Sequence, residues 1–165
     1  MTVTTSTHVL IEDIAYLARR MRPDEIEQDL AMTGMTEYDP EQAIIKMAAV
    51  HGPKFVILAD NVPVVAGGFW QVRPGVWEGW QLGTMEGWEA HWRTITKVTR
   101  RLNDQMLAQP DVHRLQLYGL AGREKTFEWY EWLGYHREAP LSRYCANGAD
   151  AVLFARVKKV KEETA

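Results

Sequence analysis

The sequence has few of the features that define whole classes of protein. Its 165 residues include a single cysteine, Cys145, so an intrachain disulfide framework and a cysteine-based zinc site are both excluded. No apolar run reaches the ~18 residues that cross a bilayer, and the N-terminus has neither a basic segment nor a long apolar one. We therefore expect a soluble chain with no membrane partner and no signal peptide.

A strong excess of one charge is also missing. Lys and Arg number 19 against 22 Asp and Glu, which gives a formal net charge of −3. A chain without a basic excess does not attract phosphate backbones, so we predict no nucleic-acid partner. The histidines have no i, i+4 pairing, and we predict no metal site at His51, His91, His113 or His136.

Tryptophan, in contrast, is abundant, with seven residues in a chain that is 46% hydrophobic and 25% charged. This length and composition are typical of one globular domain. We predict a single domain over 1–165, with its core at about 9–157 and polar termini at 1–7 and 158–165. Cys145 lies in a predicted strand and is expected to be a small core residue.

The pattern of apolar residues predicts helices first and then strands. Asp13 is suited to cap a first helix, Pro23 to open a second and Asp39-Pro40 to open a third. The following segments predict a three-strand meander, a long helix from Trp88, a strand, a helix near 124–133 and a closing hairpin at Asn147-Gly148. The predicted strands are Phe55–Ala59, Val62–Val72, Val76–Leu82, His113–Leu120, Tyr144–Ala146 and Ala151–Val157.

This order of elements resembles the fold of the GCN5-related N-acetyltransferases. The segment Tyr130–Tyr135 resembles the family's motif of tyrosine, charged residue, variable residue, leucine, glycine and aromatic residue. The resemblance covers about residues 9–157. It implies an α+β fold of three-layer α/β/α type, with a mixed, mainly antiparallel sheet of about six to seven strands and four to five helices.

Several segments also resemble a narrower group, the acetyltransferase-like internal virion protein A of short-tailed (podoviral) bacteriophages. These segments are Met21–Glu27, Val65–Gly68, Trp80–Thr84 and Trp132–Tyr135. This resemblance implies other phage structural or assembly proteins as partners, a place in the host cytoplasm or the virion, and a role in virion morphogenesis.

The acetyltransferase resemblance implies a site for acetyl-coenzyme A between the strands Val76–Leu82 and His113–Leu120. Tyr130 matches the family's general acid, and Glu78 lies where a base often acts through water. Two alternatives stay open. Tyr130 also fits an apolar stripe with Phe127 and Leu133, and Glu78 also fits an exposed strand position.

The segment that matches the family's phosphate loop departs from its pattern. Candidate contacts to the cofactor are Gln81, Leu82, Gly83, Thr84, Gly87, Arg93 and, where the family often has asparagine, Arg123. The glycine spacing differs from the family's, and Glu86 and Glu89 would repel a diphosphate, although acids in a first helical turn also stabilise the helix.

Two hypotheses follow. The chain is either a phage protein with a degenerate acetyl-coenzyme A site that acts in virion assembly, or an active N-acetyltransferase that modifies a protein amine of the host or the phage. Most of the tryptophans fall in segments around the predicted cleft, so their rings either line a cofactor cleft or close it.

Overall fold

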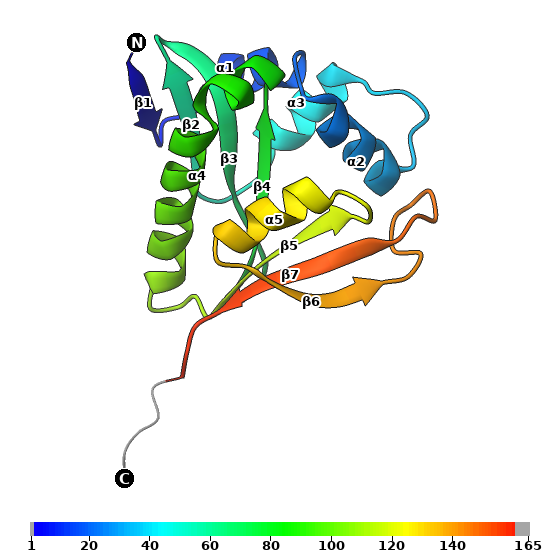
Figure 1. Ribbon diagram of the computed structural model, residues 1–165. Helices are drawn as coiled ribbons and strands as arrows, with labels where there is room; N and C mark the ends of the chain where they lie inside the picture. The colour runs from blue at the N-terminus through cyan, green and yellow to red at the C-terminus, as the bar shows by residue number, and fades with distance from the viewer. Residues whose placement is uncertain (1, 161–165) are drawn as a thin grey trace.

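The computed structural model describes residues 2–160, which form one seven-stranded sheet with helices on both faces (Figure 1). The predicted three-layer fold, with its strand and helix numbers, is confirmed. The strands are β1 (Val3–Ser6), β2 (Lys54–Ala59), β3 (Val62–Arg73), β4 (Val76–Gly83), β5 (Arg114–Leu120), β6 (His136–Leu141) and β7 (Ala151–Val157). The helices are α1 (Ile11–Ala18), α2 (Pro23–Thr33), α3 (Pro40–Ala48), α4 (Met85–Ala108) and α5 (Glu124–Trp132).

The sheet has two antiparallel halves that meet at a short parallel joint. The strand order is β1-β2-β3-β4-β5-β7-β6, and every pairing is antiparallel except that between β4 and β5. That pairing covers only three residue pairs, from Val76 opposite Arg114 to Glu78 opposite Gln116. Beyond Glu78 the two strands separate, so a gap opens in the middle of the sheet (Figure 1).

Two hydrophobic cores hold the layers together on opposite faces of the sheet. On the α1/α3 face, Leu17 of α1 packs with Val56, Ala66 and Leu82. On the α4/α5 face, the buried side chains belong to α4, α5 and the strands beneath them, including Ile95, Leu115, Phe127, Leu133 and Phe154. Because successive residues of a strand point to opposite faces, β4 contributes Leu82 to one core and Trp77 to the edge of the other.

The predicted closing hairpin is wrong. The strand that pairs with β7 is β6, and Tyr144–Ala146 lie in a loop. The turn signal itself is real, since Gly148 has φ 84° and its N–H donates to the carbonyl of Cys145. The loop packs on α2 instead of forming a strand, because Cys145 is buried beside Ala31 and the N–H of Asn147 donates to the carbonyl of Ala31.

Helix boundaries also differ from those expected. The first helix begins before Asp13, whose carboxylate accepts from the N–H of Leu10 at 3.0 Å as the third residue of the helix. The long helix begins at Met85 and not at Trp88, because Thr84 caps it. The starts at Pro23 and Asp39 are confirmed.

The two predicted polar termini have different outcomes. Residues Val3–Ser6 form an edge strand beside β2. Of the C-terminal segment 158–165, residues 161–165 lie outside the described part of the chain. Among the described residues, no helix is both long and apolar enough to cross a membrane.

Candidate functional site

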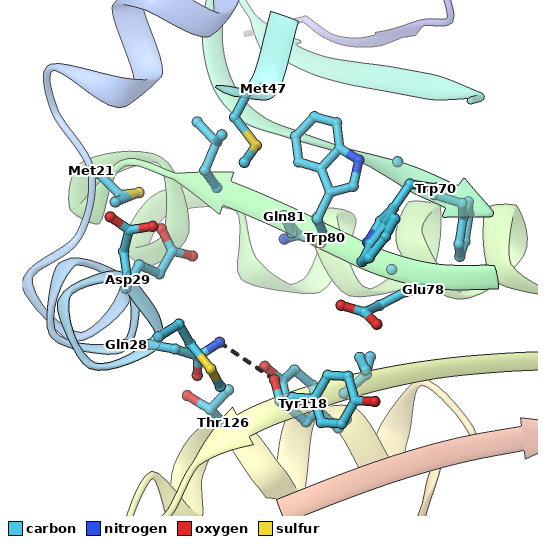
Figure 2. A pocket seen from close by; sticks show the side chains of 18 of the residues that line it. Met21, Gln28, Asp29, Met47, Trp70, Glu78, Trp80, Gln81, Tyr118 and Thr126 are labelled. Atoms are coloured by element: carbon cyan, nitrogen blue, oxygen red, sulfur yellow. Dashed lines mark hydrogen bonds between the residues drawn. The ribbon is translucent and has the colours of Figure 1, made fainter. Parts of the chain in front are cut away.

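The gap between β4 and β5 holds a cavity of about 540 Å³. Its walls come from both faces of the sheet, with α2 at one end and Trp70 and Glu78 at the other (Figure 2). A volume of this size suits a small organic ligand or a long side chain. We call the part on the α1/α3 face the outer lobe and the part on the α4/α5 face the inner lobe.

The outer lobe combines aromatic rings with one carboxylate that has no ion-pair partner. Glu78 lies opposite Trp70 in the β3–β4 pairing, and Trp80 and Tyr118 line the same lobe. Of the other carboxylates along the cavity, Asp29 pairs with Lys46 at 3.3 Å and Glu25 pairs with Arg22, which precedes α2. Within residues 2–160, Glu78 takes part in no salt bridge.

Burial also changes the acidity of Glu78. It raises the pKa of Glu78 to about 6, against the opposing hydrogen bonds of Gln116 and Trp70. A carboxylate with this pKa is ionised at neutral pH and can accept a proton or hold a cation. A cation held there would also face the rings of Trp70 and Trp80, which attract positive charge.

The inner lobe is lined by buried polar groups among aromatic side chains. Thr99, Asn103 and Tyr130 are 5%, 4% and 9% exposed, and all three line the cavity. Burial raises the pKa of the Tyr130 hydroxyl, so it carries its proton at neutral pH. The Nε2 atom of Gln81 and the Oγ1 atom of Thr99 are buried without a hydrogen-bond partner. The lobe can therefore accommodate polar atoms of a ligand or of water.

Residues of the same chain occupy the backbone N–H groups at the start of α4. The Thr84 hydroxyl accepts from the N–H of Gly87 at 3.0 Å, and the N–H of Gly83 donates to Glu25 at 3.0 Å. A Cβ on Gly83 would lie 2.7 Å from Nε1 of Trp88, so the indole packs directly on this turn. Both of these N–H groups and the space in front of Gly83 are thus already occupied.

Four indole rings from α4 and α5 meet in two contacting pairs. Trp88 and Trp129 make an edge-on contact with centroids 4.8 Å apart, and Trp92 and Trp132 lie 6.1 Å apart. Nε1 of Trp129 also donates to Oγ1 of Thr96 at 2.9 Å. We call Trp88, Trp92, Trp129 and Trp132 the four-tryptophan cluster. It ties the two helices together over the inner lobe.

The first turns of α2 bridge the two strands where the gap is wide. Glu25 accepts from the N–H of Gly83 in β4, and Gln28 Oε1 accepts from the N–H of Leu120 in β5, each at 3.0 Å. Gln28 Nε2 donates to the carbonyl of Tyr118 at 3.4 Å, the bond drawn in Figure 2. We call Glu25 and Gln28 the α2 clip.

Charged residues surround the α2 clip. Arg22 donates to Glu25 at 3.0 Å, and Arg123 donates to Gln28 and, at 2.6 Å, to Asp24. Burial raises the pKa of Glu25 to about 7, although the Arg22 charge and the N–H of Gly83 oppose it. Burial also acts to raise the pKa of Asp24, but the hydrogen bond from Arg123 and the nearby charges lower it overall.

The structure brings some of the predicted site residues to the cavity and leaves others away from it. Glu78, Gln81, Leu82, Arg123 and Tyr130 line the cavity, the first in the outer lobe and Tyr130 in the inner one. Gly83, Thr84 and Gly87 form the closed turn at the start of α4. Arg93 is exposed on α4, where its guanidinium lies 5.0 Å from the ring of Trp92.

These residues do not fit the diphosphate of coenzyme A. A diphosphate at a helix N-terminus needs free N–H groups and positive charge. At α4 the N–H groups of Gly83 and Gly87 are already bonded, the carboxylate of Glu25 lies at the turn, and Glu86 lies in the first turn. Arg22 and Arg123 supply charge nearby, but both form ion pairs with Asp24 and Arg22 also pairs with Glu25.

Several residues of the cavity were not predicted from the sequence. Glu25 and Gln28 lie at positions i and i+3 of a half-buried helix, a spacing that places two polar side chains on one face. That spacing was the sequence signal that could have identified these two residues. Tyr118 and Tyr144, whose rings stack at 4.9 Å beside the outer lobe, gave none, because 26 residues separate them in the chain.

No group of three or more His, Cys, Asp or Glu side chains is arranged to hold a metal ion in the part of the chain that the structure describes. The described lining of the cavity combines charged groups that pair with one another, the unpaired carboxylate of Glu78, hydroxyl and amide groups, and aromatic rings.

Comparison with known proteins gives structural matches only. No protein-family model matches the chain, and no curated protein matches its sequence. An aminoglycoside acetyltransferase, AAC(6')-Ib, in complex with ribostamycin and coenzyme A has a TM-score of 0.71 at 16% identity, over 99% of this chain and 98% of that chain.

Two further structures give similar values. An acetyltransferase of the GNAT family from Bacillus anthracis has a TM-score of 0.69 at 13% identity, over 95% of both chains. The spermidine N-acetyltransferase SpeG from Vibrio cholerae has a TM-score of 0.68 at 12% identity, over 94% of this chain and 93% of that chain. These similarities show that the chain has the fold of the GCN5-related N-acetyltransferases.

Proposed function

We propose that this chain is a protein of the acetyltransferase fold with a degenerate coenzyme site, which acts in the assembly of a short-tailed phage particle or as part of it. The observation that carries the degenerate site is the closed turn at the start of α4, where Glu25 and Thr84 occupy the N–H groups of Gly83 and Gly87. The four-tryptophan cluster supports it, because its two ring pairs join α4 to α5 and Trp129 also lines the cavity. The phage setting rests on the sequence resemblance.

We also propose that the outer lobe holds an amine group of a partner. Glu78 supplies a carboxylate without an ion-pair partner in the described residues, and Trp70, Trp80 and Tyr118 supply ring faces around it. Carboxylates and aromatic faces together attract ammonium groups. Two proteins of the same fold are named for amine substrates, an aminoglycoside and spermidine.

Calorimetric titration of the purified chain tests both parts. We expect no heat of binding for acetyl-coenzyme A at millimolar ligand and a measurable heat for spermidine. A neutral diol of the same length serves as the control, because it matches spermidine in reach and lacks its charge. Micromolar binding of acetyl-coenzyme A would contradict the degenerate site, and equal binding of spermidine and the diol would contradict the amine pocket.

The assembly role has a separate test. Mass spectrometry of purified phage particles should detect this chain if it is a virion component. Its absence from particles, combined with normal particle yield from phage that lack the gene, would contradict a role in assembly.

A second candidate function is an active acetyl-coenzyme A-dependent N-acetyltransferase. It is favoured by one observation: Glu78 and Tyr130 line the same cavity from opposite faces of the sheet, so a proton acceptor and a proton donor both face the gap. Acetyl transfer to spermidine or to a phage or host protein, lost in Tyr130→Phe and in Glu78→Gln, would establish this function in place of the first.

A further inference from the structure

We propose that α2 acts as the internal ligand of the β4–β5 gap: Glu25 and Gln28 bind the backbone groups that the separated strands leave unpaired, and they close this end of the cavity from within. The inference deepens the proposed degenerate site and rests on it. Both side chains belong to the first two turns of α2, which crosses the gap between the two strands (Figures 1 and 2).

The separated strands create the need for such a ligand. A strand that loses its neighbour leaves N–H and C=O groups without partners, and a buried backbone group without a partner destabilises the fold. The β4–β5 ladder stops at Glu78 opposite Gln116, so the edges beyond these residues face the gap. Water, an external ligand or the chain itself must satisfy them.

On the β4 side, the α1–α2 segment takes both backbone groups of Gly83. The N–H of Gly83 donates to Oε2 of Glu25 at 3.0 Å, and its carbonyl accepts from the N–H of Arg22 at 3.1 Å. An isolated bridge between Met21 and Thr84 continues this contact by one residue. The segment therefore adds to β4 in the way that a neighbouring strand would.

On the β5 side, one side-chain amide binds the strand edge in the same way. Gln28 accepts from the N–H of Leu120 through Oε1 and donates to the carbonyl of Tyr118 through Nε2. An amide that donates and accepts along one strand edge reproduces the pattern of a peptide group in a sheet. Gln28 thus substitutes for the peptide that the departing strand no longer supplies.

The buried arginines hold the two side chains in place. The Arg22 side chain is 16% exposed and contacts Glu25, and the Arg123 side chain is 9% exposed and contacts Gln28. Because Arg123 precedes α5 and Arg22 precedes α2, these contacts also join α2 to α5. Glu25 and Gln28 are accordingly positioning residues: they hold the two strand edges at a fixed separation and occupy backbone groups that an external chain would need.

Hydrogen exchange of individual backbone amides, followed by NMR, tests this inference in the full chain. In the wild type we expect the Gly83 and Leu120 amides to exchange slowly, although each lies beyond the last β4–β5 residue pair. Fast exchange at both amides would overturn the inference, and this measurement needs no variant to fold.

Variants then assign the protection to each side chain. Glu25→Ala should raise the exchange rate of Gly83 by about tenfold or more and leave Leu120 nearly unchanged, and Gln28→Ala should do the reverse, because each removes one acceptor. Glu25→Gln keeps an acceptor oxygen and should restore the protection of Gly83. The matched control is Glu27→Ala, which changes an exposed residue of the same helix.

The results separate this inference from the proposed function. Unchanged exchange at Gly83 and Leu120 in both alanine variants would overturn the internal ligand, even if the wild type binds no coenzyme. If the wild type binds acetyl-coenzyme A and both amides still exchange slowly, the degenerate site is contradicted. The internal hydrogen bonds of the α2 clip are then still supported. Site-specific loss of protection, rescued by Glu25→Gln, supports the inference.

Discussion

The two lobes of the cavity differ in what fills them, although they share one gap in one sheet. The inner lobe is bordered by Trp129 of the four-tryptophan cluster and by a turn whose N–H groups are bonded within the chain. The outer lobe presents Glu78 among exposed and half-buried rings, including Trp70 at 41% exposure. If the proposed degenerate site is correct, aromatic residues close one side and line the other.

This difference indicates that different residues determine the fold and the properties of the cavity. The short parallel joint and the gap beyond it are set by the strand register and by the two cores on either face of the sheet. Which lobe is open depends on a few side chains at the edges of the gap. The proposed degenerate site would thus leave the fold intact while one half of the site is closed.

The largest expected effect comes from removing a ring of the closed side. Trp129→Ala should lower the free energy of unfolding by about 3–5 kcal/mol, because it leaves a cavity beside Trp88 and breaks the hydrogen bond to Thr96. Trp70→Ala, on the open side, should lower the free energy of unfolding by less than about 1 kcal/mol, because this indole is only partly buried. Urea unfolding of both variants measures the contrast, and equal losses would contradict it.

The next effect is a dependence of stability on pH. The pKa of Glu25 is raised to about 7 from a usual value of 4.5, so the folded state holds its proton over a range in which the unfolded chain has lost it. Its contribution to stability is therefore complete below pH 4.5 and is lost as the pH rises toward 7. The loss is about 3 kcal/mol at most.

Two other carboxyl groups bear on this test. Glu78, with a pKa raised to about 6, acts in the same direction. The stabilisation from Asp24, whose pKa is lowered, is complete above its usual value of 3.8 and is lost only below it, so it does not change over this range. Urea unfolding at intervals from pH 4.5 to 7 should show a decline that is reduced in Glu25→Gln. A stability that rises across this range in the wild type and is unchanged in slope by Glu25→Gln would refute the assignment.

A smaller effect is expected at the open side. Glu78→Gln should weaken spermidine binding by about tenfold, or ~1.4 kcal/mol, because the amide keeps the shape of the side chain and removes its charge. The control is Glu86→Gln, an acid of the first turn of α4 that does not line the cavity. Calorimetry should show a clear loss for Glu78→Gln only; similar affinities in both variants would place the amine elsewhere.

The smallest effect distinguishes two roles for Glu86. If this carboxylate mainly stabilises the start of α4, Glu86→Gln should lower the free energy of unfolding by about 0.3–1 kcal/mol and should not produce coenzyme binding. Thermal unfolding and titration with coenzyme A measure the two outcomes. New binding in this variant would show that Glu86 itself, and not the bonded turn, excludes the diphosphate.

Much of the fold could be predicted from the sequence, because its signals are local. Pro23 and Asp39 mark helix starts, Asp60-Asn61 marks the β2–β3 turn with positive φ at both residues, and the meander follows from short apolar runs. The predicted closing hairpin was wrong even though its turn signal was real. The residues beside the turn pack on α2, where the N–H of Asn147 donates to the carbonyl of Ala31, and no local sequence pattern predicts this contact.

The site could be predicted only where a motif marked it. Tyr130 and Glu78 were named from the resemblance, and both line the cavity; their chemical roles stay predictions. Glu25 and Gln28 were missed, because their importance depends on two strand edges that lie about sixty and ninety residues away in the chain. Separations of this size are fixed by tertiary packing and not by the spacing of residues within a helix.

The three-residue joint between β4 and β5 also has a consequence for the order of folding. Strands β2, β3 and β4 are joined by turns of two residues, so their hairpins close short loops, whereas β5 meets β4 only after the 24 residues of α4. We therefore expect the meander to form before the parallel joint. Since the α2 clip requires both strands in place, we expect closure of this end of the cavity to follow assembly of the sheet and to be a late step of folding.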